Sequence, residues 1–326
     1  MPETERQILA RHGGSLRGRL RACRLHSSAL GIRKPYFVYE PPGWRGQQRL
    51  PLLYLFRGHE REWVNIGEDA SRRATTAIED LDERIAEGRL PPMLVVVPGL
   101  NSTNNHVPSL GIDMAGTWPE TLRGLGAGRF WRFMIGELLP RVERDYPETR
   151  GGLRLAAGFS LGGYTVSLLA THYPGYFDHA GIYDGLFMWP DHHDPRVPKT
   201  GERTDPIWCA SPLFDAALGA PRDPSAMRRW NPTDTLRLAH GDVLSTIKKT
   251  TFWIASAPAD GSRGNVDRAR FFVDLLREKG IPVGFDKVIF DADAAHTWHW
   301  TDRFLMHFLE QVLDLPGPSK KRKNFL

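Results

Sequence analysis

The sequence predicts an α/β fold in which helices cover both faces of a mostly parallel sheet. Short apolar runs that end at glycine or proline alternate with segments whose apolar residues recur every three or four positions. This alternation favours a parallel sheet, because each helix returns the chain to the start of the next strand. A third observation is the turn Gly158-Phe159-Ser160-Leu161-Gly162, which lies between one such strand and one such helix.

Composition indicates a globular protein with a large core. Of 326 residues, 41% are hydrophobic and 25% are charged, so we expect a single domain over residues 1–326. Residues 1–13 are expected to be an N-terminal tail and 316–326 a basic C-terminal tail. Much of the net charge of +5 comes from the basic run 320–323, which favours a solvated end over a contact with nucleic acid or membrane.

No targeting or membrane segment is visible. Residues 1–24 are polar and arginine-rich, unlike the apolar centre of a secretory signal. No apolar run approaches the roughly 20 residues that cross a bilayer. We therefore expect a cytoplasmic protein. Cys23 and Cys209 lie far apart in sequence and show no metal-binding spacing, and whether they pair stays open.

The elements before the serine turn follow from local patterns. Residues 14–40 alternate in a strand-like way and end at a Pro-Pro-Gly turn. The apolar runs 51–56 and 93–97 are short and are followed by glycine, which favours buried strands over helices. Residues 74–88 and 130–145 carry apolar side chains at helical spacing.

The elements around and after the serine turn continue the alternation. Residues 186–238 are rich in Pro, Asp, Trp and His with little periodicity, so we interpret them as an irregular insertion over the sheet and the active site. The remaining segments are predicted as strands at 153–157, 177–183, 251–257 and 283–290, and as helices at 161–172, 266–279 and 302–313.

Ser160 is the candidate nucleophile. A serine hydroxyl reacts only when a base removes its proton and its oxygen stands clear of the backbone. The Gly-x-Ser-x-Gly pattern marks a tight strand-to-helix turn that presents the hydroxyl in this way. By itself the pattern is a weak signal, and its position after an apolar strand and before a glycine-led helix strengthens it. The alternative is a serine that caps the helix.

His296 and Asp260 are the candidate base and acid. In α/β-hydrolases, where the Gly-x-Ser-x-Gly turn carries the nucleophile, the order along the chain is Ser, then Asp or Glu, then His, on loops after later strands. His296 follows the last predicted strand, with His299 as its nearest competitor. Asp260 directly follows the strand predicted at 251–257. Three other acids near these loops are less suited by position: Asp267, Asp291 and Asp293.

The oxyanion hole requires two backbone N–H groups aimed at the substrate oxygen. We expect the first from Leu161, the residue after the nucleophile. The second is expected from the loop after the strand at 51–56, where Gly58 allows close approach and His59 N–H is the chosen donor.

The chain resembles the esterase family of α/β-hydrolases that includes esterase D (S-formylglutathione hydrolase), enterobactin esterases, feruloyl esterases and mycolyltransferases. The resemblance covers about residues 36–313. It rests on Tyr36-Phe37-Val38-Tyr39-Glu40-Pro41-Pro42-Gly43, Leu53-Tyr54-Leu55-Phe56-Arg57-Gly58, Gly158-Phe159-Ser160-Leu161-Gly162-Gly163, and His296 followed by Trp300. It implies the α/β-hydrolase fold, the triad Ser160, Asp260 and His296, and oxyanion donors at Leu161 and His59.

The chain departs from the family pattern at three places. Arg57 stands where the family usually has histidine, Ala257 where a glycine commonly begins the acid loop, and Ala294-Ala295 where it has Gly-Gly. None of these departures removes a reacting atom. They leave the identity of the substrate open, and they make Asp260 the least secure member of the triad.

These observations predict a serine esterase that hydrolyses a small-molecule carboxylic ester or thioester through an acyl-enzyme, without cofactor or metal. An acyltransferase with the same triad and a non-catalytic binding protein of this fold are the alternatives. Asp191-His192-His193-Asp194 could bind a metal, but adjacent residues on an irregular segment rarely converge on one ion. No nucleic-acid site or membrane contact is predicted, and the oligomeric state stays open.

Overall fold

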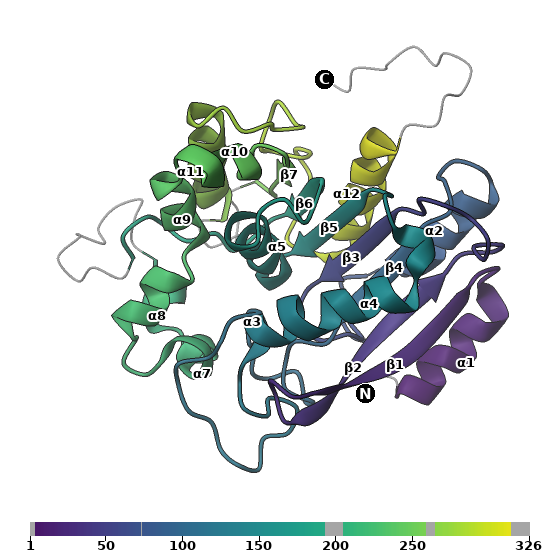
Figure 1. The fold of residues 1–326 in the computed structure, drawn as a ribbon, viewed down its shortest axis with the longest axis horizontal. Helices are drawn as coiled ribbons and strands as arrows, with labels where there is room; N and C mark the ends of the chain where they lie inside the picture. The colour runs from purple at the N-terminus through teal and green to yellow at the C-terminus, as the bar shows by residue number, and fades with distance from the viewer. Residues whose placement is uncertain (1–3, 73, 193–204, 259–264, 314–326) are drawn as a thin grey trace.

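A seven-stranded sheet forms the centre of the protein (Figure 1). The computed structural model describes residues 4–72, 74–192, 205–258 and 265–313. Across the sheet the strands run in the order β1-β2-β4-β3-β5-β6-β7. Their bounds are β1 Arg19–Ser27, β2 Ile32–Glu40, β3 Leu52–Phe56, β4 Leu94–Pro98, β5 Arg154–Phe159, β6 His179–Tyr183 and β7 Thr251–Ala255.

The sheet is mixed at one edge and parallel elsewhere. Strands β1 and β2 form an antiparallel hairpin, and β2 also pairs antiparallel with β4. The other four pairings, from β4 to β7, are parallel. Phe56 of β3 lies opposite Gly158 of β5, and Phe159 of β5 lies opposite Tyr183 of β6. The carboxyl ends of these three strands therefore meet at one edge, where α/β proteins place their sites.

Helices pack on both faces of the sheet (Figure 1). In β3 the side chains alternate between two cores, because successive residues of a strand point to opposite faces. Leu53 and Leu55 join the core beneath α1, α2 and α12, whereas Tyr54 and Phe56 join the core beneath α3, α4, α5 and α11. The bounds of these helices are α1 Glu5–Ser15, α2 Ala77–Ala86, α3 Phe130–Phe133, α4 Leu139–Asp145, α5 Leu161–His172, α11 Asn265–Glu278 and α12 Trp298–Val312.

Most of the predicted elements are confirmed, with three corrections. The segment taken as an N-terminal tail contains helix α1, which begins with a capping box between Thr4 and Gln7. The strand predicted at 283–290 is absent as a strand: Val283 and Ile289 form only isolated bridges, to Phe252 and Ser256. The helix predicted at 130–145 contains a π-helical turn, η1 (Met134–Leu138), between α3 and α4.

The segment interpreted as an irregular insertion is partly helical where it is described. Short helices cover much of it, and their apolar side chains join Tyr164 and Leu168 of α5 in a third core. The insertion is therefore packed onto the helix that follows Ser160. Its helices are α6 Pro206–Ala210, η4 Pro212–Phe214, α7 Asp215–Leu218, α8 Pro224–Arg229 and α9 Pro232–Leu238, followed by α10 Gly241–Ile247.

Within the described ranges, no helix is long and apolar enough to cross a membrane.

Candidate active site

Ser160 lies in a strained turn between β5 and α5. Its backbone has φ 54° and ψ −113°, a region that residues with a side chain rarely adopt. The two glycines of the motif are sterically required: a Cβ at Gly158 would overlap the Gly162 carbonyl, and a Cβ at Gly162 would overlap the Phe56 carbonyl. Ser160 occupies the cap position of α5, but its side chain makes no capping hydrogen bond. The hydroxyl is therefore not used to cap the helix.

His296 is held in the loop before α12. Tyr183 Oη donates a hydrogen bond of 2.8 Å to the carbonyl of Ala295. The His296 ring also packs against Phe159, the residue before the serine, with ring centroids 4.6 Å apart. These contacts place the imidazole beside the serine turn. Within the described residues Ser160 Oγ makes no hydrogen bond, and such bonds are often formed only once substrate is bound.

The partner of His296 is Asp184, a residue that the sequence did not single out. His296 Nδ1 forms a short hydrogen bond with Asp184 Oδ2. Asp184 follows β6 directly, is fully buried, and has φ 44°. Its N–H donates to the Ala255 carbonyl at 2.7 Å, which fixes the backbone of the acid to the end of β7. Asp260, the predicted acid, lies outside the described residues.

A buried polar network next to Asp184 holds this residue in place. Asn265 Nδ2 donates to the Asp184 carbonyl oxygen at 3.1 Å and to Oδ2 at 3.2 Å. Arg268, one turn further along α11, donates to Asn265 Oδ1 at 2.5 Å and forms an ion pair with Asp205. Burial lowers the pKa of Arg268 and Asp205 opposes this shift. The buried charge of Arg268 is therefore paired, and Arg268 holds the Asn265 amide that contacts Asp184.

Of the two predicted oxyanion donors, one N–H is available to a substrate and the other is already hydrogen-bonded. Leu161 is the first residue of α5, so its N–H has no acceptor within the helix and is available to a substrate oxygen. His59 N–H, the predicted second donor, donates instead to Glu62 Oε2 at 2.7 Å. Glu62 is itself buried, and burial raises its pKa while Arg57 opposes the shift. A substrate oxygen would have to displace this carboxylate to reach the His59 amide.

Arg57 packs against Phe159, the residue before the nucleophile. Its guanidinium carbon stands 5.2 Å from the centre of the Phe159 ring, and its Nε is 3.8 Å from Glu62 Oε1. Phe159 thus contacts both Arg57 and His296. At the position where the resemblance leads one to expect histidine, this chain places a fixed positive charge near the oxyanion loop.

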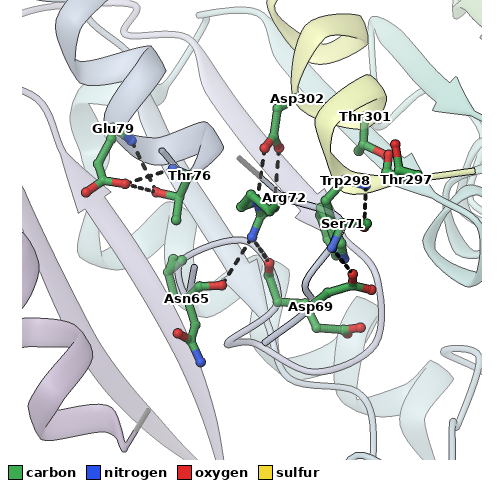
Figure 2. Close-up of polar contacts among 12 residues, drawn as sticks. Asn65, Asp69, Ser71, Arg72, Thr76, Glu79, Thr297, Trp298, Thr301 and Asp302 are labelled. Atoms are coloured by element: carbon green, nitrogen blue, oxygen red, sulfur yellow. Dashed lines mark hydrogen bonds and ion pairs between the residues drawn. The ribbon is translucent and has the colours of Figure 1, made fainter. Parts of the chain in front are cut away.

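The loop after β3 is tied to the start of α12 by a buried arginine (Figure 2). Arg72 donates to both carboxylate oxygens of Asp302, at 3.0 and 3.3 Å, and to the Glu62 carbonyl at 2.6 Å. Its guanidinium carbon is 4.1 Å from the centre of the Trp298 ring. Burial raises the pKa of Asp302 to about 6, against the opposing charge of Arg72. These contacts of Arg72 fix the helix that follows His296 to the loop that carries Glu62.

The other candidate residues lie apart from this arrangement. The His299 N–H donates to the Ser71 carbonyl at 3.3 Å, and its ring lies beside Trp300. Asp291 Oδ1 accepts from the Asp293 N–H at 2.9 Å within their own loop. Cys23 and Cys209 are both free thiols. In the possible metal segment, His193 and Asp194 fall outside the described residues.

The fold and the strained serine turn define the class as an α/β-hydrolase, and comparisons with known proteins agree. The model of the family described as "Putative esterase" matches residues 27–239, and the chain belongs to this family. Among solved structures, a ferulic acid esterase superposes with a TM-score of 0.64 at 18% identity, covering 91% of this chain and 98% of its own. An S-formylglutathione hydrolase from Agrobacterium tumefaciens gives 0.61 at 17% identity, covering 97% and 99%.

A curated relative shares more sequence over a shorter length. "Esterase Rv1288" of Mycobacterium tuberculosis strain H37Rv is 30% identical over 167 residues, which is 50% of this chain and 31% of that protein. The match therefore spans about a third of the relative's length. It supports the family assignment, and the solved structures support the fold.

Proposed function

We propose that this protein is a serine esterase that hydrolyses a carboxylic ester or thioester through an acyl-enzyme on Ser160. One observation carries the proposal: a serine in a strained turn lies beside a histidine whose Nδ1 is bonded to a buried carboxylate. This is the arrangement that activates a hydroxyl for attack on a carbonyl carbon. Membership of an esterase family supports the same reaction class.

In the first half-reaction, Ser160 Oγ attacks the carbonyl carbon and its proton passes to His296 Nε2. The imidazolium is stabilised by the Asp184 carboxylate at Nδ1. When the tetrahedral intermediate collapses, the alcohol or thiol leaves with the proton from Nε2. Water then attacks the acyl-enzyme, His296 takes a proton from it, and the acid and free Ser160 hydroxyl are released.

We assign the acid role to Asp184 in place of the predicted Asp260. The assignment rests on the hydrogen bond to Nδ1, on the full burial of the carboxylate, and on the Asn265–Arg268–Asp205 network behind it. A carboxylate fixed in this way holds the imidazole in the tautomer that leaves Nε2 free to accept the serine proton.

For the oxyanion hole we propose Leu161 N–H as the permanent donor and His59 N–H as a donor recruited from Glu62. The Leu161 amide also lies at the positive end of the α5 dipole, which favours a developing negative charge. Recruitment of the second amide would make the site complete only with substrate bound, a form of induced fit.

The test is a panel of p-nitrophenyl esters and acyl thioesters of varied acyl length, assayed with the wild-type protein and with Ser160→Ala. We expect turnover of at least one ester by the wild type, and a fall of at least about a thousandfold in the variant. Added alcohol acceptors show whether the acyl group goes to water or to an alcohol. Equal turnover by the purified variant would refute the assignment of Ser160.

A further inference from the structure

A cavity of about 310 Å³ lies beside the loop that carries His59, on the side of β2. Its volume is enough for a small ligand or for one end of a larger one. His59, Asn101 and Thr103 form part of its wall, and the His59 Nε2 atom bonds the Thr103 carbonyl at 3.2 Å. The charged side chains that line it are Glu5, Arg24, Arg33, Lys34, Glu60 and Arg61.

The lining carries an excess of positive charge. Four of its side chains are cationic and two are carboxylates, and Glu5 is already bonded to Arg24, at 2.7 and 3.3 Å. Arg33 is exposed and forms no ion pair with any described residue. Burial lowers the pKa of Lys34 and raises that of Glu60, and the charge of each residue opposes the shift of the other. His59 adds no charge, because burial lowers its pKa to about 3.

Two residues of the lining also contain buried polar atoms without partners. Arg61 Nε and Asn101 Oδ1 are inaccessible to solvent and have no hydrogen-bond partner among the described residues. A buried polar atom without a partner destabilises the folded state, so each such atom calls for an explanation. Because both atoms are covered, a ligand in the cavity would complete their hydrogen bonding only after a small shift of the Arg61 and Asn101 side chains.

The cavity is joined to the catalytic loop through the backbone. Leu100 N–H and Asn101 N–H both donate to the Gly58 carbonyl, at 2.6 and 3.0 Å. A Cβ at Gly58 would overlap the Asn101 amide, so the two residues are in close contact. Gly58 lies one residue before the His59 amide. A group bound in the cavity would therefore lie next to the segment that receives the substrate oxygen.

We propose that this cavity binds an anionic group, a carboxylate or phosphate, carried by the ester substrate. The inference rests on the proposed esterase function. It adds that the enzyme prefers esters that carry a negative charge at the end far from the ester bond. Guanidinium groups recognise such anions through paired hydrogen bonds. In the lining, Arg33 forms no ion pair with a described residue, and Arg61 has one contact of 3.5 Å, between its Nη2 and Glu68 Oε1.

The test compares two series of p-nitrophenyl esters. One has acyl chains that end in a carboxylate, from the hemisuccinate to the hemiadipate, and the other has chains of equal length that end in a methyl group. We expect the wild type to favour the anionic ester at one chain length. In Arg33→Ala/Arg61→Ala the ratio of kcat/KM between the anionic and neutral esters should fall at least tenfold. Arg132→Ala/Arg144→Ala, at two exposed arginines of α3 and α4, removes two positive charges elsewhere and should leave the ratio unchanged.

A binding measurement separates this inference from the proposed function. Calorimetry with glutarate on Ser160→Ala should show binding that the Arg33→Ala/Arg61→Ala substitutions weaken at least tenfold, whether or not any ester is turned over. A wild type that prefers the neutral esters at every chain length overturns the proposal. So does an equal loss on both ester series, or glutarate binding that the two substitutions do not change. Thermal melting of the variants confirms that they are folded.

Discussion

Asp184→Asn is the substitution that tests the buried acid most sharply. Asparagine has nearly the same shape as aspartate, so the effect of the substitution is electrostatic and not steric. Asp184 Oδ2 accepts hydrogen bonds from both His296 and Asn265, whereas Oδ1 has no partner among the described residues. Both neighbours donate to the same oxygen. The asparagine amide should therefore turn its oxygen toward them and keep the imidazole in the productive tautomer.

The size of the effect follows from the charge alone. An ion pair whose charges are about 4 Å apart is worth about 4 kcal/mol at an effective dielectric constant of 20. At about 1.4 kcal/mol per tenfold change, kcat should fall by about three orders of magnitude. A loss of about 10⁴ is expected where the tautomer is lost as well, as in serine proteases whose catalytic aspartate is replaced by asparagine. Asp184→Ala, which removes charge and orientation together, should fall at least that far.

The assay is kcat on the best p-nitrophenyl ester, measured for the wild type, Asp184→Asn and Asp184→Ala under saturating substrate. Asp191→Asn serves as the matched control, because this acid lies in the insertion and pairs with Arg237 on the surface. Activity of Asp184→Asn within tenfold of the wild type would refute the role of Asp184. A collapse of kcat on substitution of Asp260, with Asp184→Asn still active, would return the acid role to Asp260.

Three further predictions concern the frame around the site. Gly162→Ala should unfold the protein or abolish activity, because the new methyl group overlaps the Phe56 carbonyl, while Gly136→Ala, which has open space, should be neutral in thermal melting. Arg268→Met leaves Asp205 buried and unpaired, so urea unfolding should show a loss of about 3–5 kcal/mol; a loss under 1 kcal/mol would contradict the buried pair. Glu60 has its pKa raised from 4.5 to about 7 by burial, so the folded state binds more protons and stability should fall as pH rises through this window. Relative to Glu60→Gln, the wild type should lose up to about 3 kcal/mol between pH 5 and 8; parallel curves for the two proteins would count against this shift.

The sequence predicted the strands best where burial on both faces imposed an unbroken apolar run. Strands β3, β4 and β5 are of this kind, and every residue of β3 and β4 is buried. The prediction was wrong at 283–290, where the alternating pattern forms two isolated bridges instead of a continuous β-strand. There Gly284 packs directly on the Trp253 ring, and this contact is a property of the packed edge of the sheet that no local pattern reveals.

The candidate site was predicted in part. Ser160, Leu161 and His296 follow from a motif and from position along the chain, and the structure places Phe159 against the His296 ring. Asp184 was missed because an Asp-Gly pair after a strand is also an ordinary turn. The available signal was that this pair follows the strand next to the serine strand. Glu62 on the His59 amide could not be foreseen, because it depends on how a loop folds back on itself.

Covalent labelling with a fluorophosphonate probe tests most directly whether Ser160 is an activated nucleophile. Mass spectrometry of the digested wild-type protein should show one adduct, on the peptide that contains Ser160, and prior incubation with a good ester substrate should slow its formation. Ser160→Ala should not be labelled. An adduct on another residue, or a folded wild type that the probe does not label, would contradict the account.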